Sequence, residues 1–221
     1  MNSRDATDAA ARAAAYRHLA GDPVLGGLVR RVGRPDPFDR AARGFPSSTP
    51  FEALALHIVG QQISVAAALT IFARVTGAAG GTLTPRRLLG LAEDTLRTCG
   101  LSRAKAAYLH DLARRQAEGV IDVEHMDGVD DATALADLTA IHGVGPWSAQ
   151  MFLIHQLRRP DILPAGDIGI RRAVQAAWWL AEAPSPRDTA RRALAWAPFR
   201  SYASALLWTS LGAPAPQPPP A

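Results

Sequence analysis

The sequence predicts an all-α protein. Alanine, leucine and arginine dominate the composition and runs of β-branched residues are short, and both features favour helices over strands. Apolar residues recur with a helical period along much of the chain, and Ser, Thr or Asp precede several of these segments as candidate N-caps. A chain of 221 residues can bury one sizeable core or form two small subdomains that share a cleft.

The first part of the chain predicts short helices separated by loops. Gly60-Gln61-Gln62 interrupts a long apolar pattern, and Ser64 offers a fresh N-cap, so we expect two helices that meet at a corner. Residues 35–50 are rich in proline, glycine and serine and predict a loop. The helical patterns cover residues 6–19, a short stretch that begins at Asp22-Pro23, and residues 51–75, 84–91, 93–99 and 102–118.

The later part of the chain contains further helical patterns around a glycine hairpin. These patterns cover residues 130–139, 168–180, 187–196 and 199–211. The proline-rich residues 213–221 predict an extended or disordered tail. We find no internal repeat.

The hairpin Ile141-His142-Gly143-Val144-Gly145 stands between two helical patterns. Its glycines allow positive φ and bring backbone amides to the surface without an intervening Cβ, and Pro146 suits the first position of the following helix. Such amides, with a helix N-terminus behind them, form a concave site for a phosphate. A helix-hairpin-helix grips a nucleic-acid backbone in this way without reading bases. Taken alone, the turn is equally typical of a plain helix connection.

A solitary acid, Asp167, follows the hairpin and opens the pattern of residues 168–180. A carboxylate at a helix N-terminus gains typically about 0.3–1 kcal/mol from the helix dipole and the unpaired amides. Asp167 is therefore either an ordinary N-cap or a carboxylate held in its charged form for chemistry.

Four motifs in this order resemble those of the helix-hairpin-helix DNA glycosylase superfamily, and within it the alkylation-repair family, 3-methyladenine DNA glycosylase II. The resemblance covers roughly residues 50–210. The matching segments are Val59-Gly60-Gln61-Gln62-Ile63-Ser64, Gly100-Leu101-Ser102-Arg103-Ala104-Lys105, the hairpin with Gly143 to Ala149 and the approach to Asp167, and Arg200-Ser201-Tyr202 with Trp208.

The resemblance implies a compact helix-hairpin-helix glycosylase fold, in which two helical subdomains flank a cleft and no N-terminal β domain is present. We expect residues 1–212 to form the glycosylase domain. Residues 35–130 would form a six-helix-like subdomain. The N-terminal helices and residues 131–212 would form the second subdomain, which carries the hairpin at 138–158, and residues 213–221 would be the tail.

The same resemblance implies roles for individual residues. Asp167 matches the catalytic aspartate, and Gln62 matches the side chain that fills the hole left by an extruded nucleotide. The expected base pocket comprises Trp147, Trp208 and Met151. The expected DNA-binding residues are Gln61, Gln62, Ile63, Ser64, Gly143, Val144, Gly145 and Ser148. In relatives a monovalent cation, Na⁺ or K⁺, is held by hairpin carbonyls that match Thr139, Ile141 and Val144. The remaining tryptophans, Trp178, Trp179 and Trp196, we expect in the core.

The implied activity is that of a monofunctional DNA glycosylase, which hydrolyses the N-glycosidic bond of 3-methyladenine or 7-methylguanine and cuts no strand. Superfamily members that do cut use a lysine near the hairpin, where this chain has Trp147, and Lys105 is the only lysine. The alternatives are a glycosylase mainly for deaminated bases, hypoxanthine or uracil, and a helix-hairpin-helix protein that binds DNA without catalysis, which would not need Asp167.

Composition limits the partners and cofactors. The formal net charge of +4 and the pI near 10.0 fit a polyanionic partner, and we expect double-stranded DNA with damaged bases, bound by a monomer. A single cysteine, Cys99, excludes an internal disulfide and a four-cysteine iron–sulfur cluster. We expect no cofactor beyond the candidate Na⁺ or K⁺. No apolar run approaches the ~20 residues that span a bilayer, so we expect a cytoplasmic, nucleoid-associated protein and no membrane partner.

Overall fold

The computed structural model describes residues 3–39 and 49–213, with side chains from residue 7 onward. In these ranges the chain forms helices, turns and loops and no strand, which confirms the predicted all-α class. None of the helices in these ranges is long and apolar enough to cross a bilayer. The chain divides into two compact units, unit 1 with residues 1–39 and 158–221 and unit 2 with residues 40–157, and we describe each by itself.

The boundary between the units differs from the predicted one. The hairpin was expected in a subdomain with residues 131–212, but the chain passes from unit 2 to unit 1 at residues 157–158, so the hairpin lies in unit 2. Helix α9 (Pro146–His155), which follows the hairpin, is buried on almost every side and packs against α8 (Asp131–Thr139) and α3 (Pro50–Gly60). Because α9 is the central helix of unit 2, it cannot belong to the other core.

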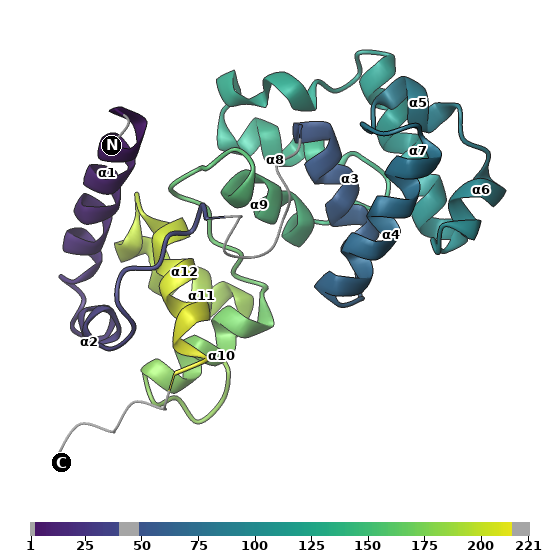
Figure 1. Ribbon diagram of the computed structural model, residues 1–221. Coiled ribbons are helices and arrows are strands. Elements are labelled where there is room, and N and C mark those ends of the chain that lie inside the picture. Colours follow the sequence, from purple (N-terminus) through teal and green to yellow (C-terminus); the bar gives the residue numbers. More distant parts are fainter. Residues whose placement is uncertain (1–2, 40–48, 214–221) are drawn as a thin grey trace. The chain divides into compact units, whose positions relative to one another are not determined.

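Unit 2 builds its core from the apolar faces of short helices. Phe51 and Ile58 of α3, Leu109 of α7 and Phe152 of α9 are all at most 1% exposed. Helix α7 lies against α3, α5 and α6 (Figure 1). The remaining elements of unit 2 are α4 (Val65–Ala78), α5 (Pro85–Leu89), α6 (Glu93–Thr98), α7 (Arg103–Ala117) and the 3-10 helix η2 (Val123–Gly128).

Unit 1 joins the two ends of the described chain. Helix α12 (Arg200–Ser210) packs against the N-terminal α1 and α2 and against α10, so purple and yellow ribbons lie side by side in Figure 1. Tyr16 of α1 contacts Tyr202 of α12 edge to face, with 5.9 Å between ring centroids, and its hydroxyl donates to the Pro35 carbonyl at 2.7 Å. The other elements are α1 (Ser3–Leu19), α2 (Pro23–Val32), α10 (Ile168–Ala177), α11 (Pro186–Arg192) and the 3-10 helix η3 (Ala193–Trp196).

Local capping explains where several helices begin. The hydroxyl of Ser64 accepts from the amide of Ala67 at 3.3 Å and starts α4, which confirms the predicted corner after α3. Ser102 starts α7 in the same way. Helix α10 ends at Ala177, before the predicted end at residue 180. Most of the predicted loop at 35–50 and of the tail at 213–221 lies outside the described residues.

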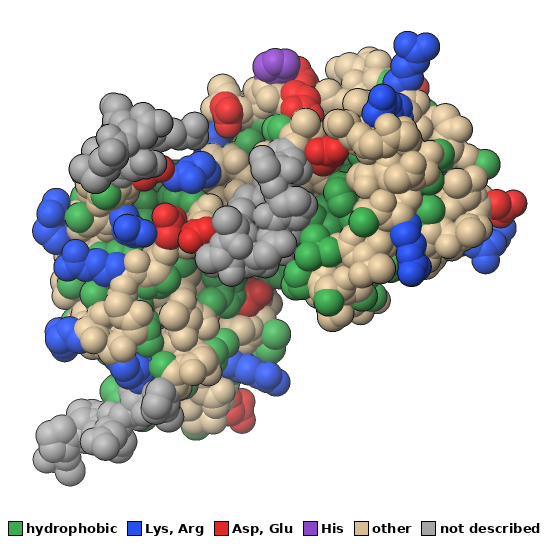
Figure 2. Space-filling view, in the orientation of Figure 1, with side chains coloured by type: hydrophobic (Ala, Val, Ile, Leu, Met, Phe, Trp, Pro, Cys, Tyr) green, Lys and Arg blue, Asp and Glu red, His purple; other side chains and the backbone are tan. Residues whose placement is uncertain are grey.

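Basic side chains are distributed rather than clustered. Figure 2 shows Lys and Arg side chains over the visible surface of each unit, interspersed with Asp and Glu. Part of this charge is paired, as in Arg158 with Asp8 and Arg200 with Asp161 in unit 1. On the face shown, positive side chains therefore form no single concentrated patch.

Candidate functional site

The hairpin of unit 2 is a tight turn between α8 and α9. The amide of Val144 donates to the Ile141 carbonyl at 3.0 Å and closes the turn. The side chains of Ile141 and Val144 are buried, 1% and 4% exposed, and anchor the hairpin to the core. The backbone between them is left at the surface, where Gly145 is the N-cap of α9 and Pro146 stands at its first position.

The hairpin glycines play different parts. Gly143 has φ of +84°, and a Cβ at this position would collide with the ring of Tyr108 on α7. Gly145 has φ of −83°, so the expectation of positive φ is wrong for this glycine. A Cβ on Gly145 would meet no protein atom within 4 Å. The fold therefore requires glycine at 143, whereas at 145 a missing side chain leaves space next to the helix N-terminus.

The N-terminus of α9 has the features of an anion site. Gly145 has no side chain to cap α9, and a helix N-terminus of this kind favours an anion. Ser148, expected to contact DNA, has a buried side chain, 6% exposed, so a contact from this residue would use its backbone amide. The site suits a phosphate that approaches along the helix axis.

An open pocket covers the outer side of the hairpin. Its lining includes the predicted cation ligands Thr139, Ile141 and Val144, together with Arg115 of α7. The Ile141 carbonyl accepts one hydrogen bond from Val144, and a carbonyl oxygen has a second lone pair that could face a cation. The carbonyl set is thus compatible with Na⁺ or K⁺, while the Arg115 guanidinium favours an anion in the same pocket.

Asp111 of α7 attaches the hairpin to its support. Its carboxylate accepts from the His142 amide at 2.9 Å and from Arg115 Nε at 2.8 Å, and it also pairs with Arg114. Burial alone would raise the pKa of Asp111, but the His142 amide and the two guanidinium groups outweigh it and hold the pKa below its ordinary value. The carboxylate is therefore stabilised in its charged form by the segment that it positions.

The loop after α3 presents polar and apolar side chains together. Gln62 has φ of +59° and is exposed, and the neighbouring Ile63 is 38% exposed. Gln61, whose predicted contact with DNA stays a prediction, donates from Nε2 to the Gly143 carbonyl at 2.8 Å and so connects the loop to the hairpin. Of the residues predicted to contact DNA in this loop, Gln62, Ile63 and Ser64 are exposed.

Lys105 holds the same loop from the other side. Its ammonium group donates to the carbonyls of Val59 at 2.8 Å and Gln61 at 2.7 Å, at the C-terminal end of α3. Partial burial lowers the pKa of Lys105 below its ordinary value. The sequence motif marked this lysine, but not its contacts, which join positions 44 and 46 residues apart.

Unit 1 holds the predicted catalytic acid at the start of α10. Asp167 is half-buried, and its Oδ1 accepts from the Ile170 amide at 2.8 Å and from Trp208 Nε1 at 3.1 Å. It is thus an N-cap, as the conservative interpretation held, and it is also held by an indole from α12. Two donors fix the orientation of this carboxylate and suit its negative charge.

Gly169 makes the contact between Asp167 and Trp208 possible. A Cβ at this position would lie 3.0 Å from Asp167 Oδ1 and 3.4 Å from Trp208 Cδ1. The sequence analysis did not single out Gly169. Its signal was a glycine in the first turn of a helix, which costs about 1 kcal/mol relative to alanine and so implies a packing requirement.

The predicted pocket residues are divided between the units. Trp208 lies in unit 1, and Trp147 and Met151 lie in unit 2, on α9. Trp147 is 48% exposed, while Met151 is buried. A shared aromatic pocket therefore stays a prediction.

The other tryptophans were all expected in the core. Trp196 is buried, and Trp178 is partly buried and stacks on Trp196 with 5.9 Å between the ring centroids. Trp179 is 45% exposed with φ of +49°, so the prediction is wrong for this residue. Its position just beyond the end of α10 turns the side chain away from the core.

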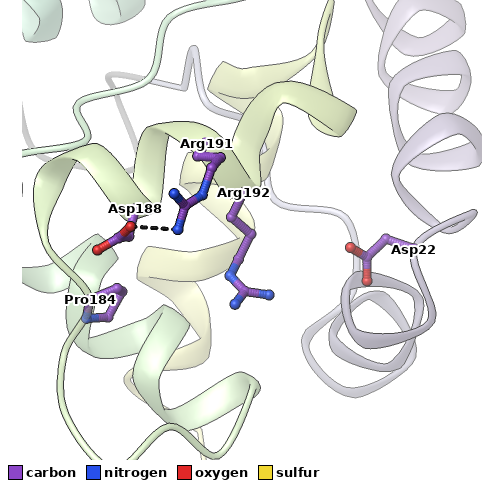
Figure 3. Close-up of a pocket in the computed structure, with 5 residues that line it drawn as sticks. All are labelled: Asp22, Pro184, Asp188, Arg191 and Arg192. Atoms are coloured by element: carbon purple, nitrogen blue, oxygen red, sulfur yellow. Dashed lines mark hydrogen bonds and ion pairs between the residues drawn. The ribbon is translucent and has the colours of Figure 1, made fainter.

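A separate pocket in unit 1 contains none of the predicted site residues. Figure 3 shows Arg192 between Asp22, the N-cap of α2, and the ion pair of Asp188 with Arg191. In this ion pair Arg191 Nη2 lies 2.7 Å from Asp188 Oδ1. Pro184 completes the lining. The Arg192 guanidinium also lies over the ring of Trp178, 4.9 Å from its centroid. Arg191 and Arg192 therefore both contact side chains of their own unit.

Comparisons with known proteins agree with this arrangement. The DNA-3-methyladenine glycosylase 1 of Schizosaccharomyces pombe is 30% identical over 195 residues, which cover 86% of this chain and 84% of the relative. A Bacillus subtilis relative, YfjP, is also 30% identical, but the chain spans only 56% of its length.

Solved structures show the same fold. The Schizosaccharomyces pombe 3-methyladenine DNA glycosylase Mag1 in complex with abasic DNA superposes with a TM-score of 0.76 and 29% identity, covering 90% of this chain and 96% of that one. The DNA-3-methyladenine glycosidase of Bacillus halodurans gives a TM-score of 0.70 at 29% identity, over 87% of this chain and 91% of that one. A family model of HhH-GPD superfamily base excision DNA repair proteins matches residues 56–199. The chain belongs to the HhH-GPD superfamily of base excision DNA repair proteins.

Proposed function

We propose that the protein is a DNA glycosylase of base excision repair that removes N-alkylated purines from duplex DNA. The observation that carries this proposal is the carboxylate of Asp167, held at the N-terminus of α10 by the Ile170 amide and the Trp208 indole. A protein that only binds DNA does not need an acid oriented in this way. The Mag1 structure, in which the relative is bound to abasic DNA, supports the same activity.

The reaction breaks the bond between the base and C1′ of deoxyribose, and positive charge develops on the sugar. Asp167 stabilises that charge because its carboxylate is already oriented before the reaction begins. The cationic methylated base takes the electrons of the broken bond and leaves as a neutral molecule, while water adds to C1′ and releases its proton to solvent. Trp208 acts on this step through its N–H, which fixes the position of Asp167 Oδ1.

DNA is bound by the surfaces of unit 2. The amides at the start of α9 bind a backbone phosphate next to Gly145. The loop with Gln62 and Ile63 enters the minor groove and fills the space left by the extruded nucleotide, because an unstacked base costs a few kcal/mol that the inserted side chain has to offset. The carbonyls of Thr139, Ile141 and Val144 would hold a monovalent cation that bridges the hairpin to the phosphate.

The substrate preference follows from the tryptophans. A methylated purine is electron-poor or cationic, and stacking it on an indole gains about 0.5–2 kcal/mol of cation–π energy. Trp147, which is exposed, and Trp208, which is held by Asp167, are the proposed stacking partners. Met151 in place of a further aromatic ring narrows the range of lesions.

The enzyme is proposed to be monofunctional. Strand cutting requires an amine that attacks C1′, and Trp147 stands where cutting relatives have a lysine. The one lysine, Lys105, is engaged with the carbonyls of Val59 and Gln61 in unit 2. Reduction with borohydride during turnover should therefore trap no covalent protein–DNA complex, and abasic product should accumulate uncut in a denaturing gel.

The decisive experiment is base release from duplexes that contain 3-methyladenine, 7-methylguanine, hypoxanthine or uracil. We expect release of the methylated purines and a fall of about 10²–10³ in single-turnover rate for Asp167→Asn, with binding of abasic DNA retained. Asp188→Asn, a matched change at an exposed acid of the same unit, should keep the wild-type rate. Release of hypoxanthine or uracil alone would assign the enzyme to deaminated bases, and no release from any duplex would leave a DNA-binding protein.

A further inference from the structure

One face of α7 supports both DNA-binding segments of unit 2. Lys105, Tyr108 and Asp111 are spaced by three residues and therefore lie along one side of the helix. Each of them contacts the backbone of a segment far away in the sequence. Helix α7 and its neighbour α3 are seen together in Figure 1.

Lys105 holds the end of this face next to α3. The last carbonyls of a helix lack partners within the helix and carry the negative end of its dipole, so a cation is favoured there. The ammonium group bonds the Val59 carbonyl inside α3 and the Gln61 carbonyl just beyond it, at 2.8 Å and 2.7 Å. It therefore fixes the direction in which the chain leaves the helix.

The turn held in this way is a strained one. Gln62 follows at once with φ of +59°, a conformation that a residue with a side chain rarely adopts and that persists only where the surroundings impose it. Gln61 contributes a second restraint by donating from its side chain to the Gly143 carbonyl at 2.8 Å. Lys105 and Gln61 therefore both restrain the backbone immediately before Gln62.

The other end of the face holds the hairpin. The Tyr108 ring fills the place of a Cβ on Gly143 and meets His142 edge to face, with 4.7 Å between the ring centroids. Asp111 accepts from the His142 amide at 2.9 Å. The loop and the hairpin are thus fixed to one rigid helix as well as to each other.

We propose that Lys105 is a positioning residue for nucleotide extrusion, whose ammonium group keeps the loop in the turn that presents Gln62 and Ile63 to the duplex. The proposal rests on the proposed function, in which this loop enters the minor groove. A loop that is already ordered loses less conformational entropy when it inserts than a loose one does. In this proposal Lys105 acts through the loop, because its ammonium group bonds the carbonyls of Val59 and Gln61.

The test compares Lys105→Met with Arg103→Met. Both changes remove one positive charge from the first turn of α7, but Arg103 is exposed and pairs with Glu93. Single-turnover base release is measured on a duplex with a paired methylated purine and on one in which the same lesion lies in a bulge, already unstacked. Extrusion is measured separately by 2-aminopurine fluorescence next to an abasic site, which requires no bond breaking.

We expect Lys105→Met to slow release from the paired duplex about 10-fold, to change release from the bulge much less, and to abolish the fluorescence rise. Arg103→Met should resemble the wild type in every assay. Lys105→Arg keeps the positive charge and the hydrogen-bond donors, so it should recover most of the wild-type rate on the paired duplex. If circular dichroism shows that Lys105→Met is unfolded, Lys105→Arg takes its place in the comparison with the wild type.

Three results would overturn the proposal. The first is an equal loss of rate for Lys105→Met on the paired and the bulged substrate. The second is a rate for Lys105→Arg as low as that of a folded Lys105→Met. The third is a salt dependence of duplex affinity that is smaller by about one unit of slope in Lys105→Met, which marks a lost phosphate contact. If the wild type releases no base, the proposed function fails, but the fluorescence assay still decides the role of Lys105. A rise with the wild type that Lys105→Met lacks supports it, and equal signals overturn it.

Discussion

At the scale of single residues, the hairpin glycines separate stability from binding. Gly143→Ala places a Cβ against Tyr108 at positive φ, so we expect a loss of about 1–3 kcal/mol in the free energy of unfolding. Gly145→Ala adds a methyl group in open space and should leave stability nearly unchanged, yet weaken binding of abasic DNA. Denaturant unfolding and fluorescence anisotropy measure the two effects. Equal DNA affinity of Gly145→Ala and wild type would show that no phosphate approaches there.

Gly169 offers a second prediction at this scale. In Gly169→Ala the new Cβ lies 3.0 Å from Asp167 Oδ1, so the carboxylate has to move by a few tenths of an ångström. We expect base release to slow about 10-fold, while the free energy of unfolding changes by no more than about 1 kcal/mol because alanine also favours the helix. Base-release rates and urea unfolding midpoints, measured on the same preparation, separate the effect on catalysis from the effect on stability. An unchanged rate would mean that the position of Oδ1 is not critical.

At the scale of elements, α7 predicts a pH dependence of stability. The pKa of Asp111 is lower in the folded protein than in the unfolded chain, so its contribution is complete above the ordinary pKa of about 3.9 and is lost as pH falls through the lower, folded value. Asp111→Asn should cost about 1–3 kcal/mol at neutral pH. In this variant the free energy of unfolding should also fall less steeply with pH below about pH 4. Denaturant unfolding at a series of pH values measures both effects. A variant with the wild-type slope would contradict the assignment.

Helix boundaries were predictable because their causes are local. Ser64 and Ser102 cap α4 and α7 through bonds to amides three residues ahead, which a short stretch of sequence contains in full. The contacts of Lys105 with Val59 and Gln61, and of Trp208 with Asp167, were not predictable in the same way. They join residues more than forty positions apart, and their geometry depends on how whole helices pack.

At the scale of the whole molecule, the all-α class and the superfamily could be read from sequence, but the division into units could not. The catalytic role of Asp167 and the phosphate-binding role of the hairpin stay predictions. The assignment of α8 and α9 to unit 2 depends on which core buries Phe152 and Leu153, and apolar periodicity is the same for either choice. The prediction that Trp179 lies in the core was wrong for a similar reason, because its exposure is decided by its positive φ after the end of α10.

The spread of charge over the surface predicts a modest salt dependence. The formal net charge is +4, and the hairpin is proposed to bind phosphate through neutral amides, which would release few counterions. For roughly two to four phosphates neutralised by side chains, log affinity for undamaged duplex should fall against log salt with a slope of about −2 to −4. Titrations between low and moderate potassium chloride measure it. A much steeper slope would point to an arginine-lined track along the DNA.

The assembly of unit 1 from two separate stretches of the chain has a consequence for biosynthesis. Helices α1 and α2 pack against α12, so a nascent chain carries them without this partner until residues 200–210 have been made. Residues 40–157 meet no such delay and can collapse while the rest is still being translated. The hairpin would then be folded before Asp167, the proposed catalytic acid, had a core around it.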